Sequence, residues 1–295
     1  MPDWVTAPLG KYYLYFADHK GAYIRLAYAD SLIGPWKIHR PGSLQLGRSH
    51  FLTSPPDISD EQLALIETNR IKAGVKLMHG IKEEITTPHI ASPDVHVDSK
   101  NQRILMYFHG LEGLAHQVTR LAISADGIHF DALPQILAKT YFRAFEWDKH
   151  TYGLAMPGQI YRSRTPEGPF EMGPILFNQH MRHAAVLLQG ETLNVFWTEV
   201  GDTPEHIKLS KIDLTGDWQQ WSEGPAVEIL KPQRPWEGAD AKLVPSVRSV
   251  AYGKVNQLRD PAIFLEGEDI YLLYAVAGES GIGIVRLDSE SKKDY

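Results

Sequence analysis

The sequence predicts an all-β chain that folds as a five-bladed β-propeller with one short helical insertion. Two observations support this class. Short runs of alternating apolar residues, rich in β-branched and aromatic side chains, are typical of strands. A unit of about 40–50 residues, built from a hairpin and further strand-like segments, recurs about five times along the chain. A β-sandwich with coincidental turns is the alternative.

Each unit contains two consecutive strand-like segments, and the first of them follows a turn cluster such as Pro8-Leu9-Gly10 or Gln189-Gly190-Glu191. This arrangement indicates a hairpin. The first segments are Lys11–Asp18, Arg103–Gly110, Thr151–Met156, Thr192–Glu199 and Asp269–Val276. The second segments are Tyr23–Ala29, Gln117–Ser124, Gln159–Arg164, His206–Ile212 and Gly281–Leu287.

We expect one domain over residues 1–295, because no linker or low-complexity segment interrupts the repeats. The predicted blades are residues 1–47, 89–138, 140–177, 182–230 and 258–290, with insertions at 48–88 and 222–257. In the first insertion, Asp60–Lys76 has helical spacing, and Asp60 is a candidate N-terminal cap. Met1–Thr6 leaves little chain for a first strand in the first blade.

Composition excludes several classes of function. The chain has 295 residues, 43% of them apolar and 10% aromatic, which is enough for a sizeable core. A net charge of −6 without a basic block argues against binding of nucleic acid. The absence of cysteine excludes disulfides, thiol nucleophiles and cysteine metal sites. No apolar run reaches the ~20 residues of a membrane span. Met1–Trp4 shows no signal peptide, so we expect a cytoplasmic protein or a processed secreted or periplasmic form.

Polar residues recur where the chain enters each blade, and blade topology would place these entries at one end of the channel. The entries are Pro2-Asp3, Pro93-Asp94, Phe142-Arg143, Arg182-His183 and Arg259-Asp260-Pro261. Loops on the same face add Asp18, His19, His109, Glu112, His116, Glu199, Asp202, Glu205 and Glu279. The insertions add His79, His89, Glu237 and Asp240.

Such a ring suits acid/base chemistry on a sugar. Carboxylates that share a partly buried site repel one another, which separates their pKa values into those of an acid and a base. Arginine and histidine suit sugar hydroxyls or the carboxylate of an acidic sugar, and Trp236 offers a stacking face. The GxSxG, P-loop, GxGxxG and HExxH motifs are absent. Turn formation by the Asp-Pro pairs and a local Arg259–Asp260 ion pair are the competing interpretations.

Three segments resemble the five-bladed β-propeller glycoside hydrolases, a group that includes families 43, 32, 68, 117 and 130. They are YYLYFADHKGAYIRLAYADSLIGPW (Tyr12–Trp36), SPDVHVDSKNQRILMYFHG (Ser92–Gly110) and LRDPAIF (Leu258–Phe264). The resemblance covers nearly the whole chain, and it implies a glycosidase with its site on the propeller channel.

The resemblance to family 43 implies an Asp base in the first blade, a pKa-tuning Asp in the second and a Glu acid in the third. Asp3 and Asp94 match the first two by position, whereas Arg143 stands where the Glu is expected. The acid would then be Glu199, Glu237 or a histidine, as in family 117. The Arg-Asp-Pro triplet is similar to that of family 32, where the Asp holds sugar hydroxyls.

Two classes of function follow: a glycoside hydrolase that acts on an oligo- or polysaccharide, or a non-catalytic carbohydrate-binding propeller. Phosphorylase or lyase chemistry is a further alternative on the same fold. The catalytic candidates are Asp94, Asp260, Glu199, Glu237 and Asp3. The substrate-binding candidates are Arg143, His183, Arg259, His89, His109, His19, Asp240 and Trp236. We expect a carbohydrate partner, no nucleic acid and no membrane. No cofactor and no metal ligand set is expected, although this fold would accept a calcium ion in its channel.

Overall fold

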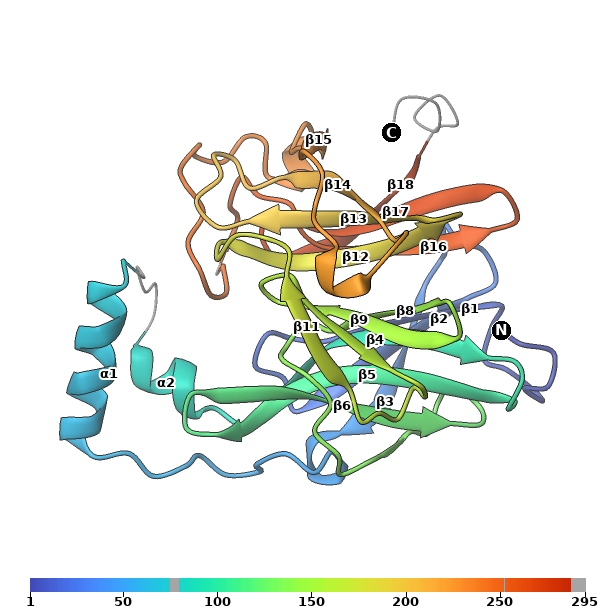
Figure 1. The fold of residues 1–295 in the computed structure, drawn as a ribbon, viewed down its shortest axis with the longest axis horizontal. Helices are drawn as coiled ribbons and strands as arrows, with labels where there is room; N and C mark the ends of the chain where they lie inside the picture. Colours follow the sequence, from blue (N-terminus) through green and yellow to red (C-terminus); the bar gives the residue numbers. More distant parts are fainter. Residues whose placement is uncertain (75–79, 252, 288–295) are drawn as a thin grey trace. The chain divides into compact units, whose positions relative to one another are not determined.

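The computed structural model describes residues 1–74, 80–251 and 253–287. Its strands form five antiparallel sheets, the blades, and its helices α1 and α2 both fall in the first predicted insertion (Figure 1). The prediction of an all-β five-bladed propeller with a short helical insertion is confirmed. The chain divides into two compact units. Of the described residues, the first comprises 1–70, 80–142 and 165–170, and the second comprises 71–74, 143–164, 171–251 and 253–287.

The first unit holds blades 1 and 2. Blade 1 consists of β1 (Tyr12–Phe16), β2 (Tyr23–Ala29) and β3 (Lys37–Gln45), followed by the short 3-10 helix η1 (Leu46–Arg48). Blade 2 consists of β4 (Ile90–Asp98), β5 (Arg103–Gly113), β6 (His116–Ser124) and β7 (Asp131–Ala132). Met1–Thr6 forms turns in place of a strand, so blade 1 has three strands where blade 2 has four.

The insertion helices are α1 (Asp60–Lys72) and α2 (Ile81–Thr86), and an Arg70–Glu84 ion pair of 3.8 Å joins them. The capping side chain of α1 is that of Ser59, one residue before the predicted Asp60. Ser59 Oγ accepts from the Gln62 N–H at 3.2 Å, and Gln62 Oε1 accepts from the Ser59 N–H at 3.0 Å. This reciprocal pair is a capping box. The helix ends at Lys72, and residues 75 and 76 of the predicted helix, like His79, lie outside the described residues.

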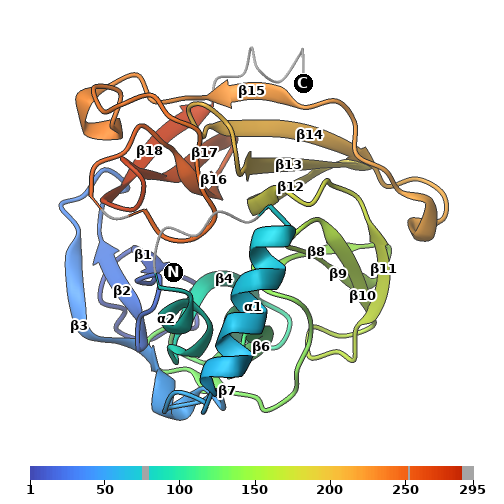
Figure 2. The same cartoon turned by 90° about the vertical axis from the view of Figure 1, so that its left-hand side faces the viewer.

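The second unit holds blades 3, 4 and 5. Blade 3 consists of β8 (Arg143–Trp147), β9 (His150–Ala155), β10 (Gln159–Ser163) and β11 (Glu171–Ile175). Blade 4 consists of β12 (Met181–Gln189), β13 (Thr192–Glu199), β14 (Ile207–Asp213) and β15 (Val227–Leu230). Blade 5 consists of β16 (Arg259–Glu266), β17 (Asp269–Val276) and β18 (Gly281–Leu287). The 3-10 helices η2 (Trp218–Gln220) and η3 (Pro235–Glu237) lie between β14 and β16 in the chain. Figure 2 shows the strands of blade 4 side by side in chain order.

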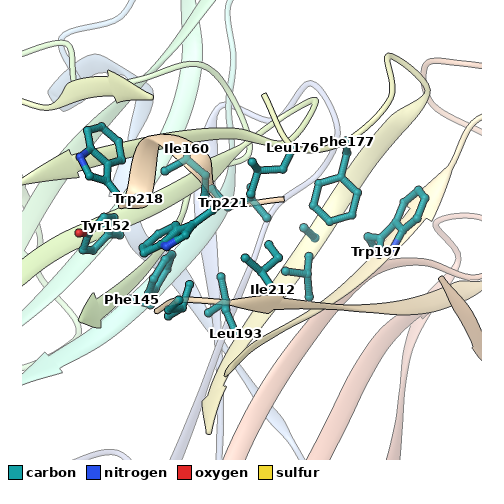
Figure 3. Packing of buried hydrophobic residues seen from close by; sticks show 14 of the residues in the cluster. Phe145, Tyr152, Ile160, Leu176, Phe177, Leu193, Trp197, Ile212, Trp218 and Trp221 are labelled. Carbon is teal, nitrogen blue, oxygen red and sulfur yellow. The ribbon is translucent and has the colours of Figure 1, made fainter. Parts of the chain in front are cut away.

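An aromatic core fills the space between blades 3 and 4 of the second unit. Phe145 and Tyr152 of blade 3 stack with their ring centroids 5.4 Å apart (Figure 3). The ring centroid of Trp221 lies 5.0 Å from that of Tyr152. Leu193 of blade 4 is fully buried in the same cluster. These side chains are the apolar faces of alternating strands, and their burial against each other is the main favourable contribution to folding of such a unit.

The first strands of blades 2, 4 and 5 share an irregularity that positions the candidate site. In each one, three residues along the first strand oppose two on its hairpin partner. The pairing register shifts between Ala91 and Asp94 in β4, between Met181 and Ala184 in β12, and between Arg259 and Ala262 in β16. A bulge of this kind re-aims the side chains of the extra residues and is frequent beside active sites. Three of the five polar blade entries predicted from the sequence therefore lie at bulges.

We predict that Leu193→Ala lowers the free energy of unfolding by about 2–5 kcal/mol, because it leaves a cavity in the packed core between blades 3 and 4. Leu243→Ala is the matched control, since Leu243 is exposed, and its effect is expected to stay within about 0.5 kcal/mol. Urea denaturation followed by tryptophan fluorescence measures both. Equal losses for the two variants would contradict the assigned core.

Candidate active site

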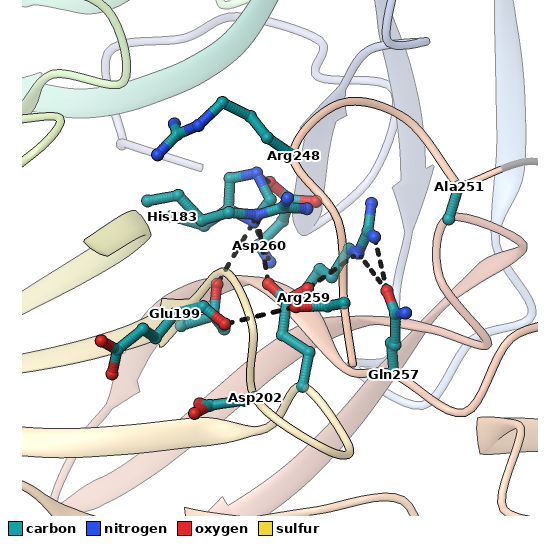
Figure 4. Close-up of polar contacts among 12 residues, drawn as sticks. His183, Glu199, Asp202, Arg248, Ala251, Gln257, Arg259 and Asp260 are labelled. Atoms are coloured by element: carbon teal, nitrogen blue, oxygen red, sulfur yellow. Dashed lines mark hydrogen bonds and ion pairs between the residues drawn. The ribbon is translucent and has the colours of Figure 1, made fainter. Parts of the chain in front are cut away.

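Four of the residues predicted from the sequence meet in the second unit. Arg143 begins β8, His183 lies in the bulge of β12, and Arg259 and Asp260 begin β16. Figure 4 shows His183, Arg259 and Asp260 pointing toward one another, with Glu199 and Asp202 to one side. We call the set Arg143, Arg182, His183, Glu205, Arg259, Asp260 and Glu279 the charged cluster.

His183 and Asp260 form the contact between the two bulged strands. His183 Nε2 lies 3.3 Å from Asp260 Oδ1, and the Asp260 backbone N–H points at His183 Nδ1 across 3.4 Å. The second contact makes Nδ1 an acceptor, so the network assigns the proton of a neutral imidazole to Nε2, where it is donated to the carboxylate. Asp260 adopts a φ of +46°, a conformation rare outside glycine and frequent at functional sites.

The Asp260 carboxylate is accessible although protein atoms surround it. The Asp260 side chain is 40% exposed, whereas the His183 side chain is 7% exposed. Burial raises the pKa of Asp260, and the guanidinium groups of Arg182, Arg259 and Arg143 act in the opposite direction. Arg143 is fixed for this purpose, because its Nε donates to the Ala184 carbonyl at 2.7 Å. Burial outweighs the three arginines, so the pKa of Asp260 lies above its ordinary value, which suits a carboxylate that accepts a proton.

Glu279 is the second accessible carboxylate of the charged cluster. It follows β17, and its side chain is 23% exposed. Burial and the charge of Asp260 raise the pKa of Glu279 to about 7, although Arg259 opposes the rise. Its Oε1 accepts from Arg259 Nη1 at 2.9 Å and from the Ala251 N–H at 3.4 Å. Glu279 therefore retains its proton up to near neutral pH, as a proton donor requires.

The other members of the cluster are buried ions. Glu205 is completely buried (0% exposed) and lies between two buried arginines. Its Oε1 is 3.1 Å from Arg182 Nε, and its Oε2 is 3.4 Å from Arg259 Nε. Arg259 also donates to Gln257 Oε1, from Nε at 3.0 Å. Burial next to Arg182 lowers the pKa of Arg259, which shows the cost of placing the two cations together.

Residues 246–251 run alongside the cluster and contact it at every second position. The Val247 carbonyl accepts from Arg182 Nη1 at 3.2 Å, and the Ser249 carbonyl accepts from Arg259 Nη1 at 3.2 Å. Together with the Ala251 N–H on Glu279, these bonds attach the segment to three cluster side chains. The predicted insertion 222–257 thus supplies one side of the charged cluster.

Four further candidates lie in the second unit with other partners. Glu199 binds Lys208 Nζ at 2.5 Å and accepts from Asn178. Glu237 is buried, where it accepts from the Gln233 and Arg234 N–H groups and from the Tyr274 hydroxyl at 2.9 Å. Asp240 is exposed and pairs with Lys254, and Trp236 is exposed beside Gly283. These contacts explain the acidic side chains as structural groups, and their catalytic roles stay predictions.

The remaining candidates lie in the first unit. Asp94, which follows the bulge of β4 and pairs with Tyr107, accepts from His96 Nε2 at 2.7 Å. Asp3 is exposed in the turns that precede β1, and His19 follows β1 with its backbone N–H on Asp18. His89 and His109 are buried, with ring centroids 6.0 Å apart. Burial lowers the pKa of His89 to about 4, so that histidine is neutral at physiological pH.

Within the described residues, no group of three or more acidic or histidine side chains is arranged to hold a metal ion. None of the helices in that part of the chain is both long and apolar enough to cross a membrane.

The candidates chosen from the sequence omit three members of the charged cluster: Arg182, Glu205 and Glu279. All three belong to the blade entries or to the loops between second and third strands, which the sequence analysis singled out as groups. Their roles depend on burial and on partners distant in the sequence. Glu205 and Arg259, for example, are 54 positions apart, and no local pattern links them.

Comparison with known proteins finds one relative by sequence and several solved structures with a similar fold. No family model matches the chain. It is 33% identical over 296 aligned residues to the uncharacterized protein R118 of Acanthamoeba polyphaga mimivirus, covering 94% of this chain and 76% of that protein.

Solved structures that share the fold include glycoside hydrolases. A thermostable family-43 glycoside hydrolase matches with a TM-score of 0.56 at 13% identity, over 94% of this chain and 86% of the other. An endo-1,4-β-xylanase from Bacteroides thetaiotaomicron matches with 0.58 at 11%, over 94% and 86%. A family-43 β-xylosidase/α-arabinofuranosidase from a compost metagenome, in complex with xylotriose, matches with 0.54 at 12%, over 94% and 87%. The predicted resemblance to propeller glycoside hydrolases is confirmed at the level of the fold.

We predict that Glu279 makes stability depend on pH in a window from about 4.5 to 7. Its pKa is about 7 in the folded chain against an ordinary 4.5, so the folded state binds the proton more tightly. This contribution is present at low pH and is lost as the pH rises through 7. Between pH 5 and pH 8 the free energy of unfolding should therefore fall by about 2 to 3 kcal/mol more in the parent chain than in Glu279→Gln.

Urea denaturation at a series of pH values measures this difference. Glu228→Gln is the control, because its pairing with Lys231 lowers the pKa of Glu228 and keeps its titration below the window. Parallel pH curves for the parent chain and Glu279→Gln would show that the pKa of Glu279 is not raised.

Proposed function

This chain belongs to the same family as the mimivirus protein R118, and we propose that it is a glycoside hydrolase that cleaves a glycosidic bond in an oligo- or polysaccharide by carboxylate acid/base catalysis. The observation that carries the proposal is the pair Asp260 and Glu279. Both carboxylates are accessible, they interact electrostatically, and their environments differ. Burial raises the pKa of both carboxylates, but Arg182, Arg259 and Arg143 oppose the rise at Asp260, whereas the charge of Asp260 adds to the rise at Glu279, whose pKa is about 7.

The proposed roles follow from these protonation states. Glu279 donates its proton to the glycosidic oxygen as the bond to the leaving sugar breaks. Asp260 acts at the anomeric carbon, either as the base that takes a proton from the attacking water or as the nucleophile. His183 orients the Asp260 carboxylate through its Nε2–H. In this scheme the charge of Arg143 acts on the pKa of Asp260, and that of Arg259 acts on the pKa of both carboxylates. Catalytic roles for Asp94 and Asp3 of the first unit stay predictions.

The substrate class rests on the fold and on the chemistry of the cluster. The compost β-xylosidase/α-arabinofuranosidase was solved with xylotriose, and a family-43 hydrolase and a xylanase are among the other matched structures. Carboxylate, imidazole and guanidinium groups are the usual hydrogen-bonding partners of sugar hydroxyls. We therefore propose plant and marine oligosaccharides as the first substrates to test, with products detected by mass spectrometry.

We predict that Glu279→Gln and Asp260→Asn each lower kcat/KM on the substrate so found by about 10²–10⁴-fold, since each removes a proton-transfer or charge-stabilising group. The kcat/KM of the parent chain should fall as the pH rises above about 7, where Glu279 loses its proton. Glu228→Gln, whose side chain is 48% exposed, is the control and should retain the parent rate.

The same screen separates the alternatives. Binding of sugars without any cleavage over long incubation would replace the enzyme with a carbohydrate-binding propeller. Turnover that requires inorganic phosphate would indicate a phosphorylase, and an unsaturated product would indicate a lyase. Full activity in both Glu279→Gln and Asp260→Asn would remove the carboxylate pair from the mechanism.

A further inference from the structure

We infer that Glu205 is a positioning residue that holds both proposed catalytic carboxylates in place through Arg182 and Arg259. The inference rests on the proposed function for its consequence in catalysis, but its structural part stands independently. Glu205 belongs to the loop between β13 and β14, and its carboxylate contacts both guanidinium groups from the buried side of the cluster.

Two chains of contacts lead from this one carboxylate. The first runs through Arg259, which pairs with Glu205 at 3.4 Å and with Glu279 at 2.9 Å. The second runs through Arg182, which pairs with Glu205 at 3.1 Å and whose Nε is 3.4 Å from His183 Nδ1. His183 in turn reaches Asp260 at 3.3 Å. A single anion therefore fixes the partners of the proton donor and of the second carboxylate.

The burial of Glu205 makes this arrangement rigid. Its side chain is 0% exposed and that of Arg259 is 1% exposed, so neither exchanges its partner for water. The backbone of Glu205 is also fixed, because its carbonyl accepts from the Leu258 N–H at 2.9 Å, one residue before β16. Glu205 thus joins the loop of blade 4 to the strand that carries Arg259 and Asp260.

The charge of Glu205 also balances the two arginines. The charges of Arg182, Arg259 and Arg143 oppose the rise in the pKa of Asp260. The charges of Arg259 and Arg182 likewise oppose the rise in the pKa of Glu279. The charge of Glu205 acts on Asp260 in the opposite direction. Without Glu205, Arg259 would retain Glu279 as its ion-pair partner in the cluster, and both arginines would act more strongly on the two carboxylates.

The test is Glu205→Gln, which keeps the shape of the side chain and removes its charge. The pKa of Glu279 is read from the carboxyl carbon in NMR titrations of ¹³C-labelled protein, with its signal assigned by its loss in Glu279→Gln. We expect the pKa of Glu279 to fall by about half a unit or more. The high-pH limb of the kcat/KM profile should move to lower pH by the same amount. Glu228→Gln is the control, with both readouts unchanged.

The outcomes are distinct. A less stable Glu205→Gln protein with an unchanged Glu279 pKa would make Glu205 a purely structural ion and overturn the inference. A shifted pKa in a chain without glycosidase activity would support the positioning role and count against the proposed function only. If Glu205→Gln does not fold, Glu205→Asp serves instead: it keeps the charge, is too short by one methylene to reach both arginines, and should shift the pKa in the same direction by less.

Discussion

The buried ion cluster around Glu205 is the constraint on which the candidate site depends. A carboxylate with 0% exposure between Arg182 and Arg259 is costly to desolvate, and removing either partner would leave a buried charge. The cluster is therefore tolerated only while all of its members stay in register. That requirement ties the loop after β13, the first strand of blade 4 and the first strand of blade 5 to one geometry.

The bulges at the start of β12 and β16 set the directions of the side chains in the candidate site. A regular strand would alternate its side chains between two faces, so consecutive residues such as Arg182 and His183 would point apart. The extra residue in each bulge changes this alternation locally. Arg182 is thereby paired with the buried Glu205, while His183 contacts the accessible Asp260. One short segment thus supplies both a support of the candidate site and a group that contacts its accessible Asp260 carboxylate.

The site also illustrates how a protein separates two carboxylates that interact. Burial raises the pKa of both carboxylates, and Arg182 and Arg259 oppose the rise at both. The difference arises from Arg143, which acts on Asp260, and from the charge of Asp260, which raises the pKa of Glu279. Backbone groups of residues 246–251 add to this selectivity, because the Ala251 N–H is directed at Glu279 and the carbonyls of Val247 and Ser249 at the arginines.

The sequence by itself determined the repeat, the strands and the polar blade entries. Periodicity is a local property, and it correctly placed β13, β17 and β18 to the residue as well as the class of fold. It also singled out Arg143, His183, Arg259 and Asp260, because charged or imidazole side chains recur where the chain enters each blade. Only the tertiary structure decided which acids are engaged elsewhere, as with Glu199 on Lys208 and Glu237 on Tyr274, and which acids interact electrostatically, as Asp260 does with Glu279. Burial and charge partners set those roles, and both come from segments far apart in the chain.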